Sequence, residues 1–134
     1  MAAPTKKPTR QWRDYRTAAG GRPVKTFIES LTDEEVASII AGMKDVVERG
    51  LAVAKHLRGD VYEVRADASS RSFRLLFSAE GSYSQVLLSL SVFEKRTQKT
   101  PSRELDLAET RLRDWRLRGT AKRKAGARAT KSPR

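Results

Sequence analysis

Residues 61–77 read VYEVRADASSRSFRLLF, and this stretch decides the fold class because its apolar side chains recur at every second position. Within it, Glu63 and Arg65 alternate with apolar residues, and the second half repeats the pattern. A period of two predicts β-strands that bury one face. The intervening segment ADASS is short and rich in turn-forming residues. The stretch therefore predicts two antiparallel strands, 61–66 and 71–77, joined as a hairpin.

The preceding segment, residues 23–50, has the periodicity of helices instead. Apolar residues spaced by three and four positions follow Pro23, which suits the first turn of a helix. Thr32 and Glu35 form a capping box that begins a second helix, since each side chain can accept a hydrogen bond from the other residue's backbone N–H. Gly50 is a suitable C-cap. The sequence therefore predicts an αα-hairpin with almost no linker.

Three further elements complete the predicted fold. Residues 10–18 and 85–95 have the composition of strands, and Thr100-Pro101 begins a helix that we expect to end at Gly119. The predicted order is β-α-α-β-β-β-α. It indicates an α+β fold: an antiparallel sheet of about four strands, with the N-terminal αα-hairpin and the C-terminal helix packed on one face. The other face would then be open.

The positive charge of the chain is concentrated at its ends. The 134 residues carry a formal net charge of +12. Residues 1–9 hold two of the cationic residues and 120–134 hold six, which leaves 20 cationic against 16 acidic residues in 10–119. Both ends lack a periodic apolar pattern, so we expect flexible basic tails around one domain, 10–119. Such tails attract polyanions; nucleic acid, an acidic protein or the ribosome would each fit.

Composition argues against several classes of protein. No apolar run is long enough to cross a membrane, and the N-terminal MAAPTKKPTR lacks the apolar core of a secretory signal. The absence of cysteine excludes disulfides and thiolate chemistry, so we expect a cytoplasmic protein without membrane contact. The single histidine, His56, rules out a histidine-pair nuclease and favours a structural or surface role. We expect no metal and no cofactor.

The open face of the predicted sheet collects cations around one aromatic ring. Alternation places Glu63, Arg65, Arg74, Phe93 and Lys95 on it. Arginine can hold a phosphate through two parallel hydrogen bonds, and a base can stack on an aromatic ring. This combination favours a small RNA site. The alternative is a structural one, in which Glu63 pairs with the two arginines in a salt-bridge network.

RNA cleavage without metal requires few protein groups, because the 2′-hydroxyl beside the scissile phosphorus is itself the nucleophile. The enzyme must align it, move protons and stabilise charge on the phosphate. Of the three cations, only Lys95 can carry a proton, since arginine stays protonated. Arg65 and Arg74 would stabilise the phosphate, and Glu63 is an alternative base. Further RNA or phosphate contacts are expected from Phe93, Arg71, Arg96 and Lys99.

Three motifs, in this order, carry a resemblance: HLRGDVYEVR, RSFRLLF and VLLSLSVFEKRTQKTPSREL, followed by the helix LAETRLRDW. From about Trp12 to Trp115, the sequence resembles the phage-derived, HigB-like branch of the RelE/ParE toxin superfamily. The resemblance implies a RelE-like fold and a type II toxin–antitoxin toxin that cleaves mRNA, commonly on the ribosome. It also implies a cognate antitoxin, often with a helix-turn-helix domain. It assigns the family's motif cations to Arg65, Arg74, Lys95 and Lys99.

The chain departs from the family's pattern beside Lys95. Members often have an aromatic residue or a second lysine where this sequence has Glu94 and Arg96. An acid close to Lys95 would interfere with proton transfer, but strand alternation points Glu94 away from it. Some branches of the superfamily have lost nuclease activity or poison gyrase. Two alternatives therefore stay open: a non-catalytic toxin that binds a protein target, and a phage-encoded nucleic-acid-binding protein.

Overall fold

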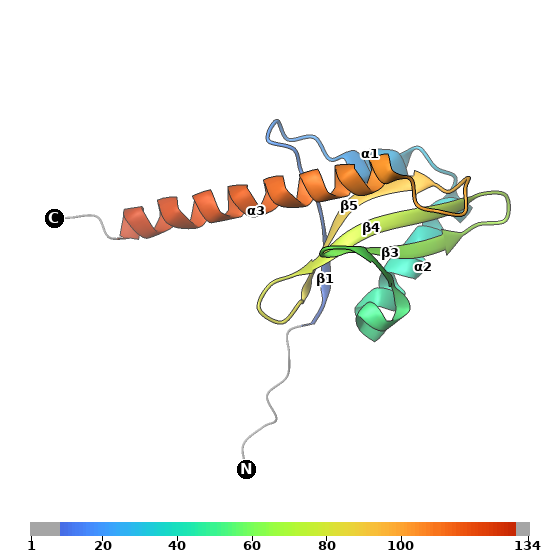
Figure 1. Cartoon of the computed structure of the whole chain (residues 1–134). Coiled ribbons are helices and arrows are strands. Elements are labelled where there is room, and N and C mark those ends of the chain that lie inside the picture. The colour runs from blue at the N-terminus through green and yellow to red at the C-terminus, as the bar shows by residue number, and fades with distance from the viewer. Residues whose placement is uncertain (1–8, 131–134) are drawn as a thin grey trace, which may run out of the picture.

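The structure is a computed structural model that describes residues 9–130, with side chains described for 9–121. In chain order its elements are β1 (Gln11–Asp14), α1 (Pro23–Glu29), α2 (Asp33–Arg49), the 3₁₀ turn η1 (Gly50–Val53), β2 (Lys55–Arg58), β3 (Val61–Asp67), β4 (Ser72–Glu80), β5 (Val86–Glu94) and α3 (Ser102–Thr130). Figure 1 shows the strands in one twisted sheet and α3 extending beyond it. The predicted α+β class is confirmed.

The sheet has five strands in the order β1-β5-β4-β3-β2. Strands β2 to β5 are antiparallel neighbours, whereas β1 runs parallel to β5, with Gln11 opposite Val86. The sheet is therefore mixed, and the prediction of about four antiparallel strands was incomplete. The sequence does not indicate β2, because KHLR contains a single apolar residue. The direction of β1 is set by the αα-hairpin that follows it, which no local pattern encodes.

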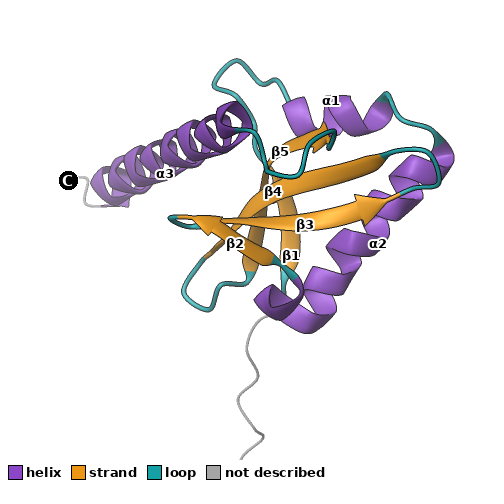
Figure 2. Ribbon diagram, turned by 45° about the vertical axis from the view of Figure 1, so that its right-hand side comes forward, coloured by secondary structure: helices purple, strands orange, loops and turns teal. Residues whose placement is uncertain are grey.

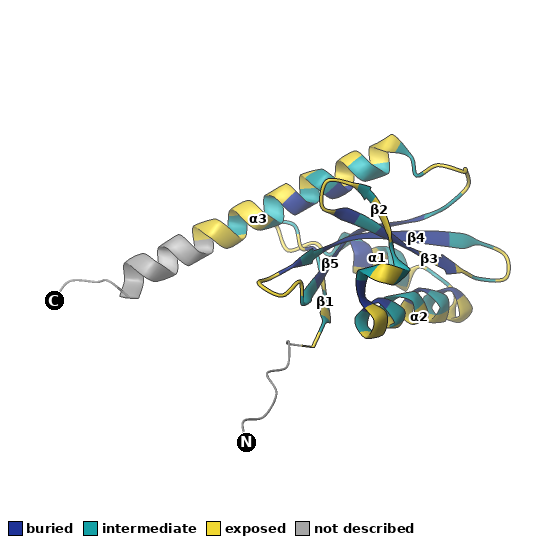
Figure 3. Ribbon diagram, turned by 60° about the horizontal axis from the view of Figure 1, so that its bottom comes forward, coloured by how far each residue is buried: buried dark blue, intermediate teal, exposed yellow. Residues whose placement is uncertain are grey.

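The helices cover both faces of the sheet, so the expectation of one covered and one open face was wrong. Helices α1 and α2 lie on one side and α3 on the other, as Figures 2 and 3 show. Each side has its own hydrophobic core. Phe73, Leu75 and Phe77 of β4 belong to the core under α1 and α2, while Leu76 between them belongs to the core under α3. An apolar residue on each face of β4 is typical of a strand buried on both sides.

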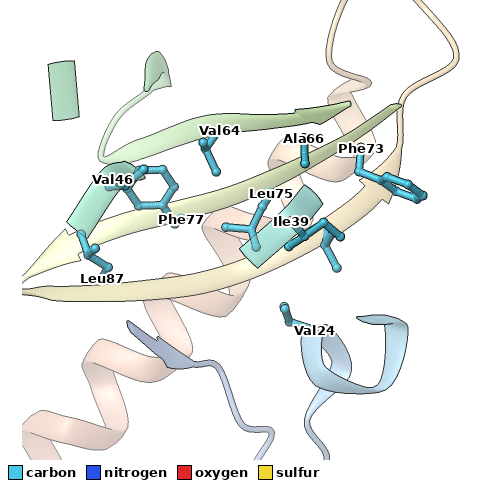
Figure 4. Close-up of a cluster of buried hydrophobic side chains, with 10 residues drawn as sticks. Val24, Ile39, Val46, Val64, Ala66, Phe73, Leu75, Phe77 and Leu87 are labelled. Carbon is cyan, nitrogen blue, oxygen red and sulfur yellow. The ribbon is translucent and has the colours of Figure 1, made fainter. Parts of the chain in front are cut away.

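The core under α1 and α2 holds β3 in place. Figure 4 shows side chains of this core, which come from both helices and from β3, β4 and β5. The predicted capping box is confirmed, because Thr32 and Glu35 exchange side-chain to backbone hydrogen bonds of 3.0 and 3.3 Å. Gly42 lets α2 approach β3 closely, since a Cβ at this position would lie 3.2 Å from the backbone oxygen of Arg65. Gly50 has a φ of 75° and ends α2 as predicted.

A β-bulge in β5 shapes the core under α3. Leu76 pairs with Ser91, but the next residue of β4 pairs with Ser89, so Leu90 is the additional residue of β5. Leu88 and Leu90 consequently face α3, whereas Val92 lies in the other core. The prediction that alternate residues from Val86 to Val92 share one face was therefore wrong. One inserted residue moves every later side chain to the opposite face.

Helix α3 is bound to the sheet by apolar and polar contacts. Ala108 and Leu112 are buried against it. The Tyr15 hydroxyl donates to Asp114 at 2.5 Å, and Arg116 forms an ion pair with Glu80 at 2.9 Å. These contacts hold the middle of α3 against the sheet.

The helix continues past Gly119, where the sequence predicted its end, to Thr130. One glycine in a helix costs only about 1 kcal/mol, and good helix formers flank it. Residues 120–130, which belong to the predicted C-terminal tail, are therefore helical. Residues 1–8 and 131–134 lie outside the described part, so flexibility of the two ends and the domain boundaries stay predictions. Within residues 9–130, no helix is both long and apolar enough to cross a membrane.

Candidate functional site

A polar hollow of about 500 Å³ lies where β3, β4 and β5 meet the segment between β5 and α3. We call residues 95–101 the β5–α3 loop. The sheet supplies one wall of the hollow and this loop supplies the other. The lining residues are Arg65, Ser72, Arg74, Lys95, Arg96, Thr97 and Gln98. Four of these seven are cationic, and they include all three residues predicted to be catalytic.

Arg65 and Arg74 form the sheet side of the hollow. They lie directly opposite each other on β3 and β4, and Phe93 lies opposite Arg74 on β5. Arg65 is exposed, whereas Arg74 is only 5% exposed. The guanidinium of Arg74 donates to the Phe73 carbonyl at 2.8 Å and lies 3.5 Å from the Asp67 carboxylate. Arg74 is thereby held rigidly, and Arg65 beside it reaches solvent.

Lys95 occupies the point where the sheet passes into the β5–α3 loop. Its backbone N–H donates to the Ser72 carbonyl at 2.7 Å, which ties this residue to the start of β4. Its side chain is half-buried and has no hydrogen bond or ion pair with any residue between 9 and 121. Lys95 is therefore a cation held at a fixed backbone position with its ammonium group available.

Glu94 lies away from the hollow, as strand alternation predicted. It pairs with Phe73 across the strands, and its carboxylate contacts Arg71 at 3.2 Å and Arg96 at 3.3 Å. The Arg96 guanidinium in particular holds the pKa of Glu94 below its usual range. This acid is therefore neutralised by two arginines. Its side chain makes no contact with Lys95, so the departure from the family's pattern leaves the lysine unpaired.

Arg71 has a structural position, which differs from its predicted role in RNA binding. Its guanidinium binds the 4% exposed Glu35 carboxylate through bonds of 2.6 and 2.8 Å and packs over the Phe73 ring at 5.1 Å. These hydrogen bonds, with one from the Thr32 backbone, lower the pKa of Glu35 to about 2. Arg71 therefore joins the N-terminus of α2 to β4. It does not line the hollow.

Three other predicted residues have different surroundings. Phe93 is 8% exposed and packs in the core under α3, so it is not a platform for base stacking and instead supports Arg74 from the next strand. Glu63 is 6% exposed and accepts a 2.5 Å hydrogen bond from the Thr100 hydroxyl. Lys99 is exposed on the β5–α3 loop but does not line the hollow. Arg96 does line it and is 80% exposed.

Some features of the site are not apparent from the sequence. Ser72, Thr97 and Gln98 also line the hollow, and each lies next to a segment that carries a predicted residue.

His56 lies in β2, where its ring bonds the Gly59 carbonyl at 2.6 Å, in keeping with a structural role. Among the side chains of residues 9–121, no three histidine or acidic groups gather closely enough to hold a metal ion.

The arrangement is suited to a phosphate. Arg65, Arg74 and Lys95 line one open hollow. Of the nearby acids, Asp67 approaches Arg74, Glu94 is bound by Arg71, and Glu63 accepts from Thr100. Arginine binds phosphate oxygens through paired N–H groups, and lysine adds a point charge and a transferable proton. Hydroxyl and amide groups of Ser72, Thr97 and Gln98 can supply further hydrogen bonds to a sugar or a base.

The comparison with known proteins agrees with this geometry. Residues 26–113 match the family described as "Phage derived protein Gp49-like (DUF891)". This chain belongs to the Gp49-like family. It is also similar to the "Probable endoribonuclease HigB1" of Mycobacterium tuberculosis, in strains CDC 1551 / Oshkosh and ATCC 25618 / H37Rv. In both strains the identity is 32% over 108 residues, which cover 78% of this chain and 84% of the relative.

The part that matches the Gp49-like family includes the whole hollow. Its lining residues all lie between Arg65 and Gln98, inside the matched range 26–113. Strand β1 and the last part of α3 lie outside this range. The predicted membership of a phage-derived, HigB-like group is thus confirmed.

Proposed function

We propose that this Gp49-like protein is the toxin of a type II toxin–antitoxin system and that it cleaves mRNA in the hollow between Arg65 and Lys95. The observation that carries the proposal is the convergence of Arg65, Arg74 and Lys95 from three different strands or strand ends. The similarity to a relative named as a probable endoribonuclease supports the same reaction class. The ammonium group of Lys95, which is unpaired among residues 9–121, lies on the same hollow as two arginines and supports the proposal.

The proposed reaction is a transesterification that uses the RNA's own 2′-hydroxyl. A solvent water molecule takes the proton of the 2′-hydroxyl as the 2′-oxygen attacks the adjacent phosphorus, the bond to the 5′-oxygen breaks, and the products are a 2′,3′-cyclic phosphate and a 5′-hydroxyl end. Arg65 and Arg74 bind the non-bridging oxygens and stabilise the charge that grows on them. Lys95 donates a proton from its ammonium group to the departing 5′-oxygen. No metal or organic cofactor takes part in this scheme.

The buried position of Glu63 argues against its predicted role as an alternative base. One of its carboxylate oxygens is occupied by Thr100, and Glu63 is not among the residues that line the hollow. The catalytic set that we propose is therefore Arg65, Arg74 and Lys95. Arg96 and Lys99 contribute exposed charge for RNA binding on the same loop.

Expression in a bacterial host tests this function. Induction should arrest growth, and mapping of mRNA 5′ ends should reveal new ends that carry a hydroxyl rather than a phosphate. The Lys95→Ala variant, produced at the same level, should give neither effect. Growth arrest without new mRNA ends would favour the non-catalytic toxin that binds a protein target. Unaffected growth with soluble, folded protein would reject the toxin proposal.

We further propose two partners, the ribosome that presents the mRNA and a cognate antitoxin. An antitoxin would be encoded beside this chain, and a helix-turn-helix domain is expected in it by analogy with HigB-like systems. Co-expression of the neighbouring reading frame should restore growth and yield a complex that copurifies. If co-expression neither restores growth nor yields a complex, the proposed antitoxin partner is rejected and only the proposed RNA cleavage remains.

A further inference from the structure

We infer that Glu63 and Thr100 are positioning residues, which hold the β5–α3 loop in place as one wall of the cleavage hollow. This inference rests on the proposed function. Its central observation is the 2.5 Å hydrogen bond from the Thr100 hydroxyl to the Glu63 carboxylate, which joins residues 37 positions apart in the sequence. Glu63 is 6% exposed, and Thr100 is half-buried.

The loop is attached to the sheet at both of its ends. At the first end, the Lys95 N–H donates to the Ser72 carbonyl at 2.7 Å. At the other end, Thr100 is bound to Glu63 of β3. Residues 96–99 between these two points are exposed, and three of them line the hollow. The distance between the loop wall and the sheet wall is therefore fixed by two attachments, of which only the second depends on side chains.

The chemistry of the Thr100 attachment makes it a strong one. A hydroxyl bound to an ionised carboxylate forms a charge-assisted hydrogen bond, roughly twice as strong as one between neutral groups. Pro101 adds to the effect, because a residue that precedes proline is restricted to extended backbone conformations. The Thr100 side chain is thus presented to β3 with little remaining freedom. Little conformational entropy is then lost when the loop closes on the sheet.

The placement of Glu63 connects this attachment to the catalytic cations. Glu63 and Arg65 lie on the same face of β3, two residues apart, and Arg65 lines the hollow. A single strand therefore carries both the phosphate-binding arginine and the carboxylate that holds the loop. Without the Thr100 attachment, Lys95 would be held only by its backbone bond to Ser72, and Arg96 and Gln98 could shift relative to Arg65 and pull Lys95 with them. Misplacement of a reacting group by about 1 Å can lower a rate about a hundredfold.

Three variants test the inference. Thr100→Val keeps the size and branching of the side chain but removes the hydroxyl, and Thr100→Ser restores it. Ser91→Ala is the matched control, because the buried Ser91 hydroxyl also donates to a carboxylate, that of Glu104 at 3.0 Å, on the same face but outside the hollow. Thr100→Val and Ser91→Ala each leave a carboxylate without its hydroxyl partner. Their costs in stability should be similar, and only Thr100→Val should affect the loop.

The first measurement is the cleavage rate of a defined mRNA in a cell-free translation reaction, under single-turnover conditions with saturating protein. Thr100→Val should lower the rate by about tenfold to a hundredfold, as expected for a misplaced reacting group. The half-saturating protein concentration should change much less, because Arg65 and Arg74 still bind phosphate. Thr100→Ser and Ser91→Ala should retain the wild-type rate within about threefold, the scatter expected for a change of well under 1 kcal/mol.

The second measurement does not depend on cleavage. Backbone amide hydrogen exchange of Lys95, whose N–H is bound to the Ser72 carbonyl at the other end of the loop, should accelerate in Thr100→Val and keep the wild-type rate in the other two variants. If Thr100→Val shows faster amide exchange but an unchanged cleavage rate, the positioning role is overturned. Unchanged amide exchange in Thr100→Val would also overturn it. A wild-type protein that cleaves no mRNA would instead reject the proposed function, while the exchange data would still report whether Glu63 holds the loop.

Discussion

Arg65 and Arg74 lie directly opposite each other on neighbouring antiparallel strands, so two cationic side chains form a cross-strand pair on one face of the sheet. Like charges in such a cross-strand pair are destabilising. The fold compensates only in part: Arg74 donates to the Phe73 carbonyl and approaches Asp67, while Arg65 has no ion pair with a residue in the described part of the chain. This pair of cations faces the hollow, where the phosphate contact that we propose would relieve the repulsion between them.

Lys95 is expected to be essential for cleavage and not for folding. Lys95→Ala should abolish cleavage with unchanged thermal stability, because its side chain makes no hydrogen bond or ion pair with any residue from 9 to 121. Lys95→Arg separates two roles: it should lose most of the rate if Lys95 transfers a proton, and keep the rate if Lys95 only stabilises charge. Lys44→Ala, an exposed lysine on α2, is the control. Full toxicity of both Lys95 variants would remove this residue from the site.

The two arginines should differ in their effect on stability. Arg65→Ala removes an exposed side chain and should change the free energy of unfolding by no more than about 0.5 kcal/mol. Arg74→Ala empties a buried position and should cost about 1–3 kcal/mol. Both should lower the cleavage rate strongly. Chemical denaturation combined with the cleavage assay distinguishes these outcomes, and full activity of Arg65→Ala would contradict the proposed phosphate contact.

Acid should weaken the contact between α2 and β4. The pKa of Glu35 is lowered from 4.5 to about 2 by Arg71 and the Thr32 backbone, so the stabilisation is fully present above pH 4.5 and is lost as pH falls toward 2. Glu35→Gln should therefore be less stable than wild type at pH 7, and the difference should shrink below pH 4.5. Urea unfolding at several pH values measures it. Glu48→Gln, an exposed acid on the same helix, should show no such trend.

The basic C-terminal segment should contribute to RNA affinity and little to folding. Residues 122–134 contain six of the 28 cationic residues, and a truncation after Ala121 keeps the Arg116 and Arg118 contacts of α3. Affinity for single-stranded RNA should fall and lose salt dependence, at a slope of about −0.7 per phosphate contact on single strands. A thermal melt checks the fold. An unchanged salt slope would show that this segment makes no phosphate contacts.

The local elements could be read from the sequence because short-range chemistry determines them. The Thr32–Glu35 capping box, the αα-hairpin and the strands around Arg65 and Arg74 depend on neighbours within a few positions. The alternation of β3 and β4 likewise predicted that Glu63, Arg65 and Arg74 share one face, which the register confirms. Lys95 directly follows the next strand, β5, so the sequence also placed it near these residues.

Only the tertiary structure decided which face α3 covers, how β1 is directed and which predicted residues are accessible. A single bulge at Leu90 reverses the alternation of β5, and an apolar strand such as β4 does not reveal which helices will cover each face. The roles of Glu63, Arg71 and Phe93 changed for this reason: their partners are Thr100, Glu35 and the core under α3. The sequence determines what each side chain can do, whereas long-range packing determines which of these groups remain free to do it.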